Sequence, residues 1–152
     1  MKILVITDSH GELSNIINAY ETEHPDIILS AGDCYDDIKE LSYIYNDLKY
    51  ESVRGNCDYF TDIPDQNRLL QLEGQTIFLT HGHLYGVKLR LDELERQSQK
   101  LCADIVVFGH THKPYLNKLD NVIYFNPGAM RDGRYGVITI HKDEVQCFQK
   151  QI

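Results

Sequence analysis

Short apolar runs alternate with helical patterns in the first part of the chain. Residues 2–6 form an apolar, largely β-branched run, which predicts a buried strand. Runs at residues 26–30 and about 50–54 predict two more strands. Between the runs, apolar residues recur at the spacing of one helical face: Leu13, Ile16, Ile17 and Tyr20, and then Ile38, Leu41, Tyr45 and Leu48. This alternation is typical of a largely parallel sheet.

The later part of the chain is mainly strand. Residues 68–72 and 76–80 flank Glu73-Gly74-Gln75, a pattern typical of a hairpin. A helix is expected at about 87–101, followed by a buried strand at 104–108. The inward positions of that helix are Val87, Leu91, Leu94 and Leu101. Beyond these, the patterns are those of strands only, at 122–125, 135–140 and 145–148.

These patterns predict one mixed α/β domain over residues 1–152. One sheet is expected to be largely parallel, and a second sheet, built from the hairpins, to pack on it. With 152 residues, the chain is long enough to bury a substantial core.

Composition narrows the function classes. No apolar run reaches the length of a membrane span and no export signal is recognisable, so we expect a cytoplasmic protein without membrane contact. The four cysteines show no CxxC spacing, which favours reduced thiols. The net charge of −8 repels a phosphate backbone, so stable nucleic-acid binding is not expected.

Polar residues of one chemical kind follow five of the predicted strands, each next to a glycine. They are Asp8 and His10, Asp33, Asn56, His81 and His83, and His110 and His112. Ligands bind at the carboxyl ends of strands in open α/β sheets, and imidazole and carboxylate groups are common metal ligands. Five of the seven histidines belong to this set, which core filling does not explain. The pattern therefore predicts a metal site at the strand ends.

The order of these motifs resembles the calcineurin-like metallophosphoesterase superfamily. The series is Asp8-x-His10, Gly32-Asp33-x-x-Asp36, Gly55-Asn56-x-Asp58, His81-Gly82-His83 and Gly109-His110-x-His112. The chain length and the late Asn126-Pro127-Gly128 resemble the small, single-domain bacterial and archaeal phosphodiesterase branch. The resemblance implies a four-layer α/β/β/α sandwich with a mixed sheet and a dinuclear metal site at the strand ends.

The resemblance also implies the role of each ligand. Two divalent metal ions per chain are expected, Mn²⁺ first, with Ni²⁺, Fe or Zn²⁺ as alternatives. Asp8, His10 and His112 would hold one ion and Asn56, His81 and His110 the other, with Asp33 bridging them. A metal-bridging hydroxide would attack the phosphorus of a small phosphate ester, in the first place a diester. Catalytic roles are implied for Asp33, Asn56, His83 and Asp58.

Some positions leave alternatives open. Many family members carry a histidine where this chain has Cys57, which is a poor substitute for a cationic general acid. Our hypothesis is that the enzyme prefers leaving groups that need little protonation, or uses His83, which is alternatively an orienting or turn residue. Asp36 and Asp58 are expected to orient ligands, or else are solvated loop acids. Four tyrosines lie near the active loops: Tyr35, Tyr59, Tyr85 and Tyr115. Two interpretations stay open for them, stacking on a nucleobase or aryl ester and packing of the loops.

Two competing functions come from other classes. One is a non-catalytic protein-interaction scaffold on the same fold, like the retromer subunit that resembles these phosphodiesterases. The other is a structural zinc protein, which predicts clustered cysteines that this sequence lacks. All seven ligand positions carry competent side chains, which favours the enzyme. The sequence leaves a homo-oligomer open.

Overall fold

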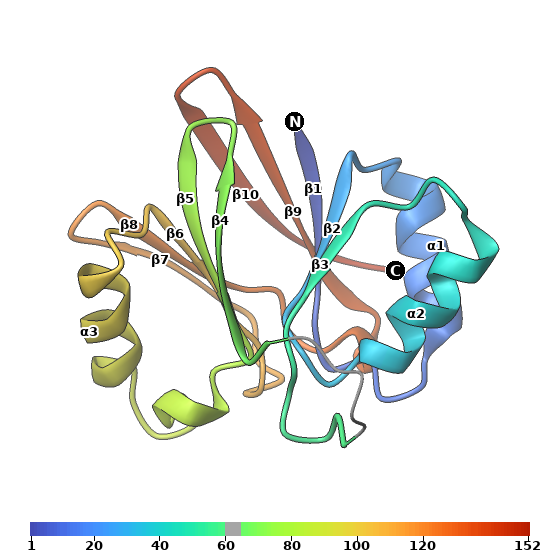
Figure 1. Ribbon diagram of the computed structural model, residues 1–152, viewed down its shortest axis with the longest axis horizontal. Helices are drawn as coiled ribbons and strands as arrows, with labels where there is room; N and C mark the ends of the chain where they lie inside the picture. The colour runs from blue at the N-terminus through green and yellow to red at the C-terminus, as the bar shows by residue number, and fades with distance from the viewer. Residues whose placement is uncertain (60–64) are drawn as a thin grey trace.

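Two five-stranded sheets lie face to face in the computed structural model, which describes residues 1–59 and 65–152 (Figure 1). Helices α1 and α2 cover the outer face of one sheet, and α3 covers the outer face of the other. The layers confirm the α/β/β/α sandwich expected from the sequence. No helix in the described ranges is long and apolar enough to cross a membrane.

The first sheet has the strand order β10-β9-β1-β2-β3. The strands β1, β2 and β3 run parallel, while β9 is antiparallel to both β1 and β10. Two helices, α1 and α2, connect the parallel strands, as a parallel sheet requires. The bounds are β1 (Lys2–Ile6), α1 (Leu13–Glu23), β2 (Ile27–Ser30), α2 (Tyr35–Ile44), β3 (Tyr50–Ser52), β9 (Arg134–His141) and β10 (Glu144–Gln151).

The second sheet has the strand order β4-β5-β6-β8-β7. Its inner strands β5, β6 and β8 are parallel, and β4 and β7 pair antiparallel at the two edges. The bounds are β4 (Asn67–Leu72), β5 (Gln75–Thr80), α3 (Asp92–Lys100), β6 (Ile105–Val107), β7 (Tyr115–Leu119) and β8 (Val122–Asn126). Two 3₁₀ turns, η1 (His83–Tyr85) and η2 (Met130–Asp132), follow β5 and β8.

The apolar runs are continuous because both faces of these strands are covered. In β1, Ile3 and Val5 point into the core between the sheets, whereas Leu4 and Ile6 pack with α1 and α2. In β5, Ile77 lies in the core between the sheets and Phe78 in the cluster beneath α3. Strands buried on both faces carry unbroken apolar sequence, which is the pattern that the chain shows.

Three elements differ from the sequence prediction. The predicted helix at 87–101 begins only at Asp92, because Gly86 takes a left-handed conformation and ends η1, although Val87 is still buried. Helix α2 ends at Ile44, since Tyr45 takes an extended backbone while its ring still packs on the core. Strand β7 was not predicted because four of its five residues are exposed and give no apolar alternation.

The loops after the parallel strands of both sheets meet at one edge of the sandwich. The Asp8 amide donates to the carbonyl of Gly32 (3.0 Å), which joins the loops after β1 and β2. The Gly109 amide donates to the carbonyl of His81 (3.1 Å), which joins those after β6 and β5. Across the two sheets, Nδ1 of His81 lies 2.7 Å from the carbonyl oxygen of Ala31. The sheets therefore bring the predicted ligand residues together.

Candidate metal centre

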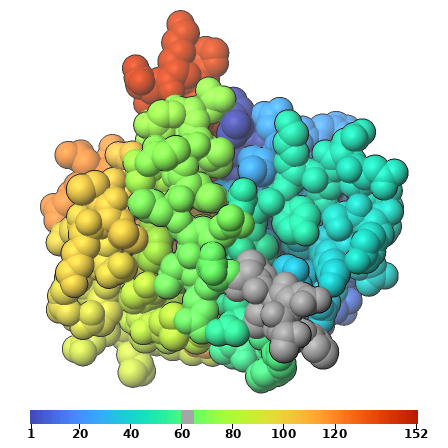
Figure 2. Space-filling view, viewed as in Figure 1, coloured from blue at the N-terminus to red at the C-terminus, as the bar shows by residue number. Residues whose placement is uncertain are grey.

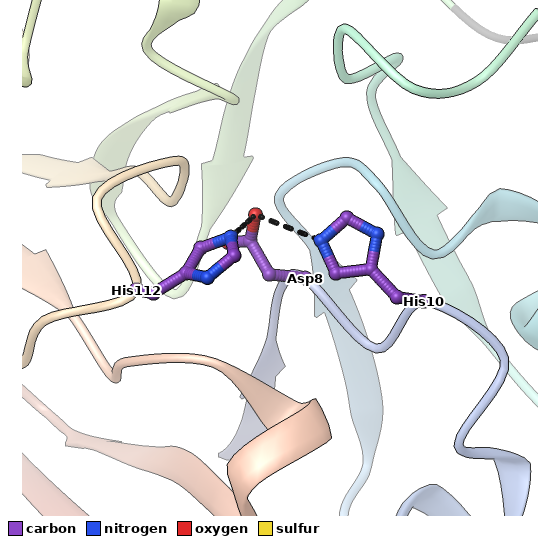
Figure 3. Close-up of side chains that lie close together, drawn as sticks. All are labelled: Asp8, His10 and His112. Carbon is purple, nitrogen blue, oxygen red and sulfur yellow. Dashed lines mark ion pairs between the residues drawn. The ribbon is translucent and has the colours of Figure 1, made fainter.

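Asp8 lies at the middle of the cluster and is fully buried. Its Oδ2 accepts hydrogen bonds from Oγ1 of Thr7 (2.7 Å) and from the amide of His110 (3.0 Å). Its Oδ1 accepts no hydrogen bond from residues 1–59 and 65–152, although Nε2 of His112 lies 3.0 Å away and Nε2 of His10 3.8 Å away (Figure 3). A buried carboxylate oxygen without a donor is costly, and a cation among these three side chains would satisfy it.

Asp33 is the second buried carboxylate of the cluster. Its Oδ1 accepts the amide of Cys57 (2.7 Å), and its Oδ2 faces Nε2 of His81 (3.4 Å) and of His10 (3.9 Å). Burial raises the pKa of this carboxyl, but the contact with His81 outweighs it, so the pKa of Asp33 lies below its ordinary value. Asp33 is thus ionised and faces histidines from two different loops.

His81 is fully buried and held by hydrogen bonds at both ring nitrogens. Because the carbonyl of Ala31 can only accept, Nδ1 of His81 carries the proton and donates to it (2.7 Å). Its Nε2 points at Oδ1 of Asn56 (3.1 Å) and Oδ2 of Asp33 (3.4 Å). A histidine whose Nδ1–H is fixed by a backbone carbonyl, with Nε2 aimed at oxygen ligands, has the arrangement of a metal ligand.

His110 and His83 lie beside His81. The ring centroid of His81 is 5.0 Å from that of His110 and 5.4 Å from that of His83. Burial, and then the charge of His81, lower the pKa of His110 to about 4 and also lower the pKa of His83. The Nδ1 atom of His83 is buried without a hydrogen-bond partner among the described residues. Both rings are therefore neutral at pH 7 in the metal-free protein.

In the part of the chain that the structure describes, potential ligand atoms form three overlapping groups, each with all its atoms within 4.8 Å of one another. The groups are Asp8, His10 and His112; Asp8, Asp33 and His81; and His10, Asp33 and Cys57. Among the described residues, Asp8, His10 and Asp33 each belong to two of these groups, so the groups form one continuous cluster. His110 is in none of these groups and borders them through its ring contact with His81.

The backbone at this centre is held in an uncommon conformation. Five of the seven predicted ligands have a positive φ, from 48° to 67°: Asp8, His10, Asp33, His110 and His112. A non-glycine residue in this region costs on the order of 1–3 kcal/mol and persists where its surroundings impose it. Gly109 has no room for a side chain, because a Cβ there would lie 1.9 Å from Oγ1 of Thr7 and 2.8 Å from Oδ2 of Asp8.

Two acids outside the ligand set hold the loops. Asp58 accepts the amides of Gly55 (2.7 Å), Asp33 (2.9 Å) and Tyr35 (3.3 Å), so it ties the loop after β3 to the loop after β2. Asp37 is buried and accepts Oγ of Ser9 and the amide of Gly11 (2.9 Å), which flank His10.

Asp36, the acid that the motif pointed to, is exposed to solvent. Arg131 lies beside the ligand set, with its Nη2 3.2 Å from Nδ1 of His112, a contact that the sequence did not predict. A contact across 19 positions leaves no periodic signal in the sequence.

The centre opens to solvent on two sides. One cavity of about 250 Å³ is lined by His10, Asp33, Tyr35 and Cys57 among others. Another, of about 340 Å³, is lined by Arg54, Asn56, Tyr59 and His83 among others. A small ligand can therefore reach the carboxylates and imidazoles from outside.

Three comparisons with known proteins agree with this geometry. Residues 1–142 match the family model described as the calcineurin-like phosphoesterase superfamily domain. A Bacillus subtilis (strain 168) protein named "Probable metallophosphoesterase YsnB" is 35% identical over 153 residues, which cover 94% of this chain and 86% of that protein. A Methanocaldococcus jannaschii protein named "Phosphodiesterase MJ0936" is 27% identical over 158 residues, 92% of this chain and 90% of that one.

Among solved structures, a Vps29 mutant from Entamoeba histolytica superposes with a TM-score of 0.79 at 20% identity, covering 100% of this chain and 99% of the other. At this identity the likeness concerns the fold alone.

Proposed function

The chain belongs to the calcineurin-like phosphoesterase superfamily, and on this premise we propose that it is a metal-dependent phosphodiesterase acting on a small phosphate ester. The observation that carries the proposal is the buried Oδ1 of Asp8, which accepts no hydrogen bond from the described residues and faces the imidazoles of His10 and His112. Imidazole nitrogens bind metals, so a cation among these three side chains would satisfy that oxygen. The phosphodiesterase MJ0936 supports the choice of a diester.

The donor set fits two divalent ions. We assign Asp8, His10 and His112 to one ion and Asn56, His81 and His110 to the other, with Asp33 shared. Mixed nitrogen and oxygen ligands suit Mn²⁺, which we propose first, and also Ni²⁺, Fe or Zn²⁺. When bound, two such ions supply a water of lowered pKa as the nucleophile and positive charge for the phosphate oxygens.

The protein residues keep the ligands in place before a metal binds. The carbonyl of Ala31 fixes a proton of His81 on Nδ1, so Nε2 is the nitrogen that faces the other ligands and binds a metal. Asp58 holds the backbone of Asp33, and Asp37 holds the residues on both sides of His10. A site held in advance loses little entropy when metal and substrate bind.

Cys57 and His83, at the rim of the metal centre, are the two residues to consider for the leaving group. The side chain of Cys57 donates no positive charge to a departing oxygen, which is consistent with leaving groups that need little protonation. His83 lines the same cavity as Arg54 and Asn56, and we assign it a hydrogen bond to the phosphate or to the leaving oxygen. Both roles stay proposals that a series of aryl diesters with different leaving groups would test.

The deciding experiment removes metal with a chelator and assays bis(p-nitrophenyl) phosphate with and without added Mn²⁺. We expect turnover to return with Mn²⁺ in the natural protein and to stay absent in Asp8→Asn. A folded, metal-loaded protein that hydrolyses no diester with any divalent ion would contradict the proposal. That outcome would favour the non-catalytic scaffold.

A further inference from the structure

A pocket next to the metal centre has a different chemistry from the centre itself. It has a volume of about 350 Å³ and lies between the segment that leads from η1 into α3 and the turn between β6 and β7. Both segments lie at the lower edge in Figure 1. Its apolar lining is Val87, Leu89, Leu91, Phe108, Pro114 and Tyr115. The volume lies in the range of about 300–1,000 Å³ that is usual for small-ligand sites.

The pocket shares a wall with the proposed metal ligands. Thr111, which lines it, stands between His110 and His112 in the chain. Oγ1 of Thr111 accepts the side-chain amide of Asn126 (3.1 Å) and the backbone amide of Lys113 (3.2 Å), so this wall is fixed. A ligand in the pocket therefore lies beside the metal centre, where the rest of a bound diester has to go.

Cations gather around this apolar lining although the chain carries a net charge of −8. They are Lys88, Arg90 and Lys113. Arg90 faces Asp92, with Nε 3.7 Å from Oδ2. For Lys88 and Lys113, no carboxylate of residues 1–59 and 65–152 lies within ion-pair distance. Two unpaired ammonium groups at the mouth of a pocket attract an anion.

The lining favours an aromatic group. The rings of Phe108 and Tyr115 pack with centroids 6.0 Å apart, and Tyr115 is only partly buried. Leu89 lines the pocket and is 93% exposed, so it adds accessible apolar surface beside Tyr115. Partly exposed aromatic and apolar side chains offer a flat surface on which a base can stack.

We propose that this pocket, the η1–α3 pocket, binds a nucleotide group of the diester substrate that carries a phosphate other than the scissile one. The base lies on the apolar lining, Lys88 and Lys113 bind the additional phosphate, and the scissile phosphate reaches the metal centre across Thr111. The inference rests on the proposed function and adds to it a substrate class, nucleotide diesters with a further phosphate.

The first test uses the chelator-treated, metal-free protein, so that the metal centre cannot bind the probe. Calorimetric titrations with AMP and with adenosine measure the contribution of the phosphate. We expect AMP to bind at least 10-fold more tightly than adenosine, and Lys88→Glu with Lys113→Glu to weaken AMP at least 10-fold. Lys118→Glu with Lys142→Glu, at two exposed positions outside the pocket lining, is the charge-matched control and leaves AMP binding unchanged. AMP that does not bind, or binds equally to all three proteins, would overturn the proposal.

A second test separates this pocket from the proposed function. In the Mn²⁺-loaded enzyme, the double variant should raise KM for 5′-phosphorylated thymidylyl-thymidine at least 10-fold more than KM for bis(p-nitrophenyl) phosphate. Equal effects on the two substrates would overturn the pocket's role. Charge-sensitive AMP binding without any diester hydrolysis would support the pocket and contradict the phosphodiesterase. Diester hydrolysis without AMP binding would support the phosphodiesterase and contradict the role of the pocket.

Discussion

Two clusters of buried ionisable side chains lie in this fold, and they differ in what balances their charge. In the first, which we call the Glu23 cluster, Glu23 accepts hydrogen bonds from Nζ of Lys150 (2.7 Å) and the hydroxyl of Tyr135 (3.0 Å), and Nζ of Lys2 lies 3.7 Å away. In the second, the metal centre, Asp8 and Asp33 face histidines, and Oδ1 of Asp8 accepts no hydrogen bond from the described residues, with Nε2 of His112 3.0 Å away.

The difference separates a structural cluster from a functional one. Burial raises the pKa of Glu23, but the hydrogen bonds from Lys150 and Tyr135 outweigh it and the pKa lies below its ordinary value. The Glu23 cluster is therefore complete with the chain's own cations. In the metal centre, no lysine or arginine of residues 1–59 and 65–152 lies within ion-pair distance of Asp8 or Asp33, and both carboxylates face histidines instead. The acid of the Glu23 cluster is paired with lysines, whereas those of the metal centre face imidazoles, which can also bind a metal.

The largest expected effect is on metal affinity in Asp8→Asn. The amide oxygen can still accept from Thr7 and from the amide of His110, but the charge facing the ions is lost. We expect Mn²⁺ affinity, measured by calorimetry, to fall by more than about 100-fold, since losing a group that only orients a ligand already costs about 10–100-fold. The urea midpoint of the metal-free protein should not fall. Asp36→Asn, at an exposed position in the first turn of α2, should change neither quantity. A large loss of stability would make this cluster structural like the first.

Glu23→Gln should lower stability and leave Mn²⁺ affinity unchanged, which is the opposite of Asp8→Asn. Removing the charge leaves Lys150 and Lys2 without their partner, and hydrogen bonds to charged groups contribute about 1.5–3 kcal/mol. We expect the free energy of unfolding, from urea titration, to fall by about that amount while Mn²⁺ affinity is unchanged. Glu40→Gln, at an exposed position on α2, is the control. Weaker Mn²⁺ binding in Glu23→Gln would show that the two clusters are coupled.

The loss of Mn²⁺ affinity in Asp37→Ala should lie between the large loss in Asp8→Asn and the unchanged affinity of Glu23→Gln. Asp37 accepts Oγ of Ser9 and the amide of Gly11, and so holds the backbone on both sides of His10. Loss of such a support typically costs about 10–100-fold in metal affinity. Asp36→Ala changes the neighbouring exposed acid and should have no effect on calorimetric Mn²⁺ binding. Equal affinities in the two variants would show that the His10 loop holds its own shape.

The metal centre was visible in the sequence because parallel strands bring their carboxyl ends to one edge. A carboxylate or imidazole directly after such a strand is therefore placed by topology, as for Asp8, Asp33 and His81. The Glu23 cluster was not visible, since Lys150 stands 127 positions and Tyr135 112 positions from Glu23. The choice between Asp36 and Asp37 depends on where α2 begins, and adjacent acids give no sign of which one turns inward.

The two clusters should also differ in the pH range over which stability and Mn²⁺ affinity change. These changes should be smaller than those caused by the substitutions. The pKa of Glu23 is lowered from 4.5, so its stabilising contribution is present above pH 4.5 and is lost as the pH falls through its lower native value. In urea titrations of metal-free protein, the stability difference between the natural chain and Glu23→Gln should be constant from pH 5.5 upward and shrink below pH 4.5. A difference that instead changes near pH 6.5 would point to histidines.

The affinity of the metal centre for Mn²⁺ should depend on pH in the neutral range. Burial lowers the pKa of His81, but its contacts with Asp33 and Asp8 outweigh this, so the pKa lies above 6.5 in the metal-free protein. A metal ion has to displace that proton, so Mn²⁺ affinity should rise with pH through this range, by at most about tenfold per pH unit for one proton. Calorimetry in buffers of different ionisation heat counts the protons released. Glu23→Gln leaves the metal centre intact, so this variant should release as many protons on binding Mn²⁺ as the natural chain. A different number of protons would mean that the lysines of the Glu23 cluster also act on the metal site.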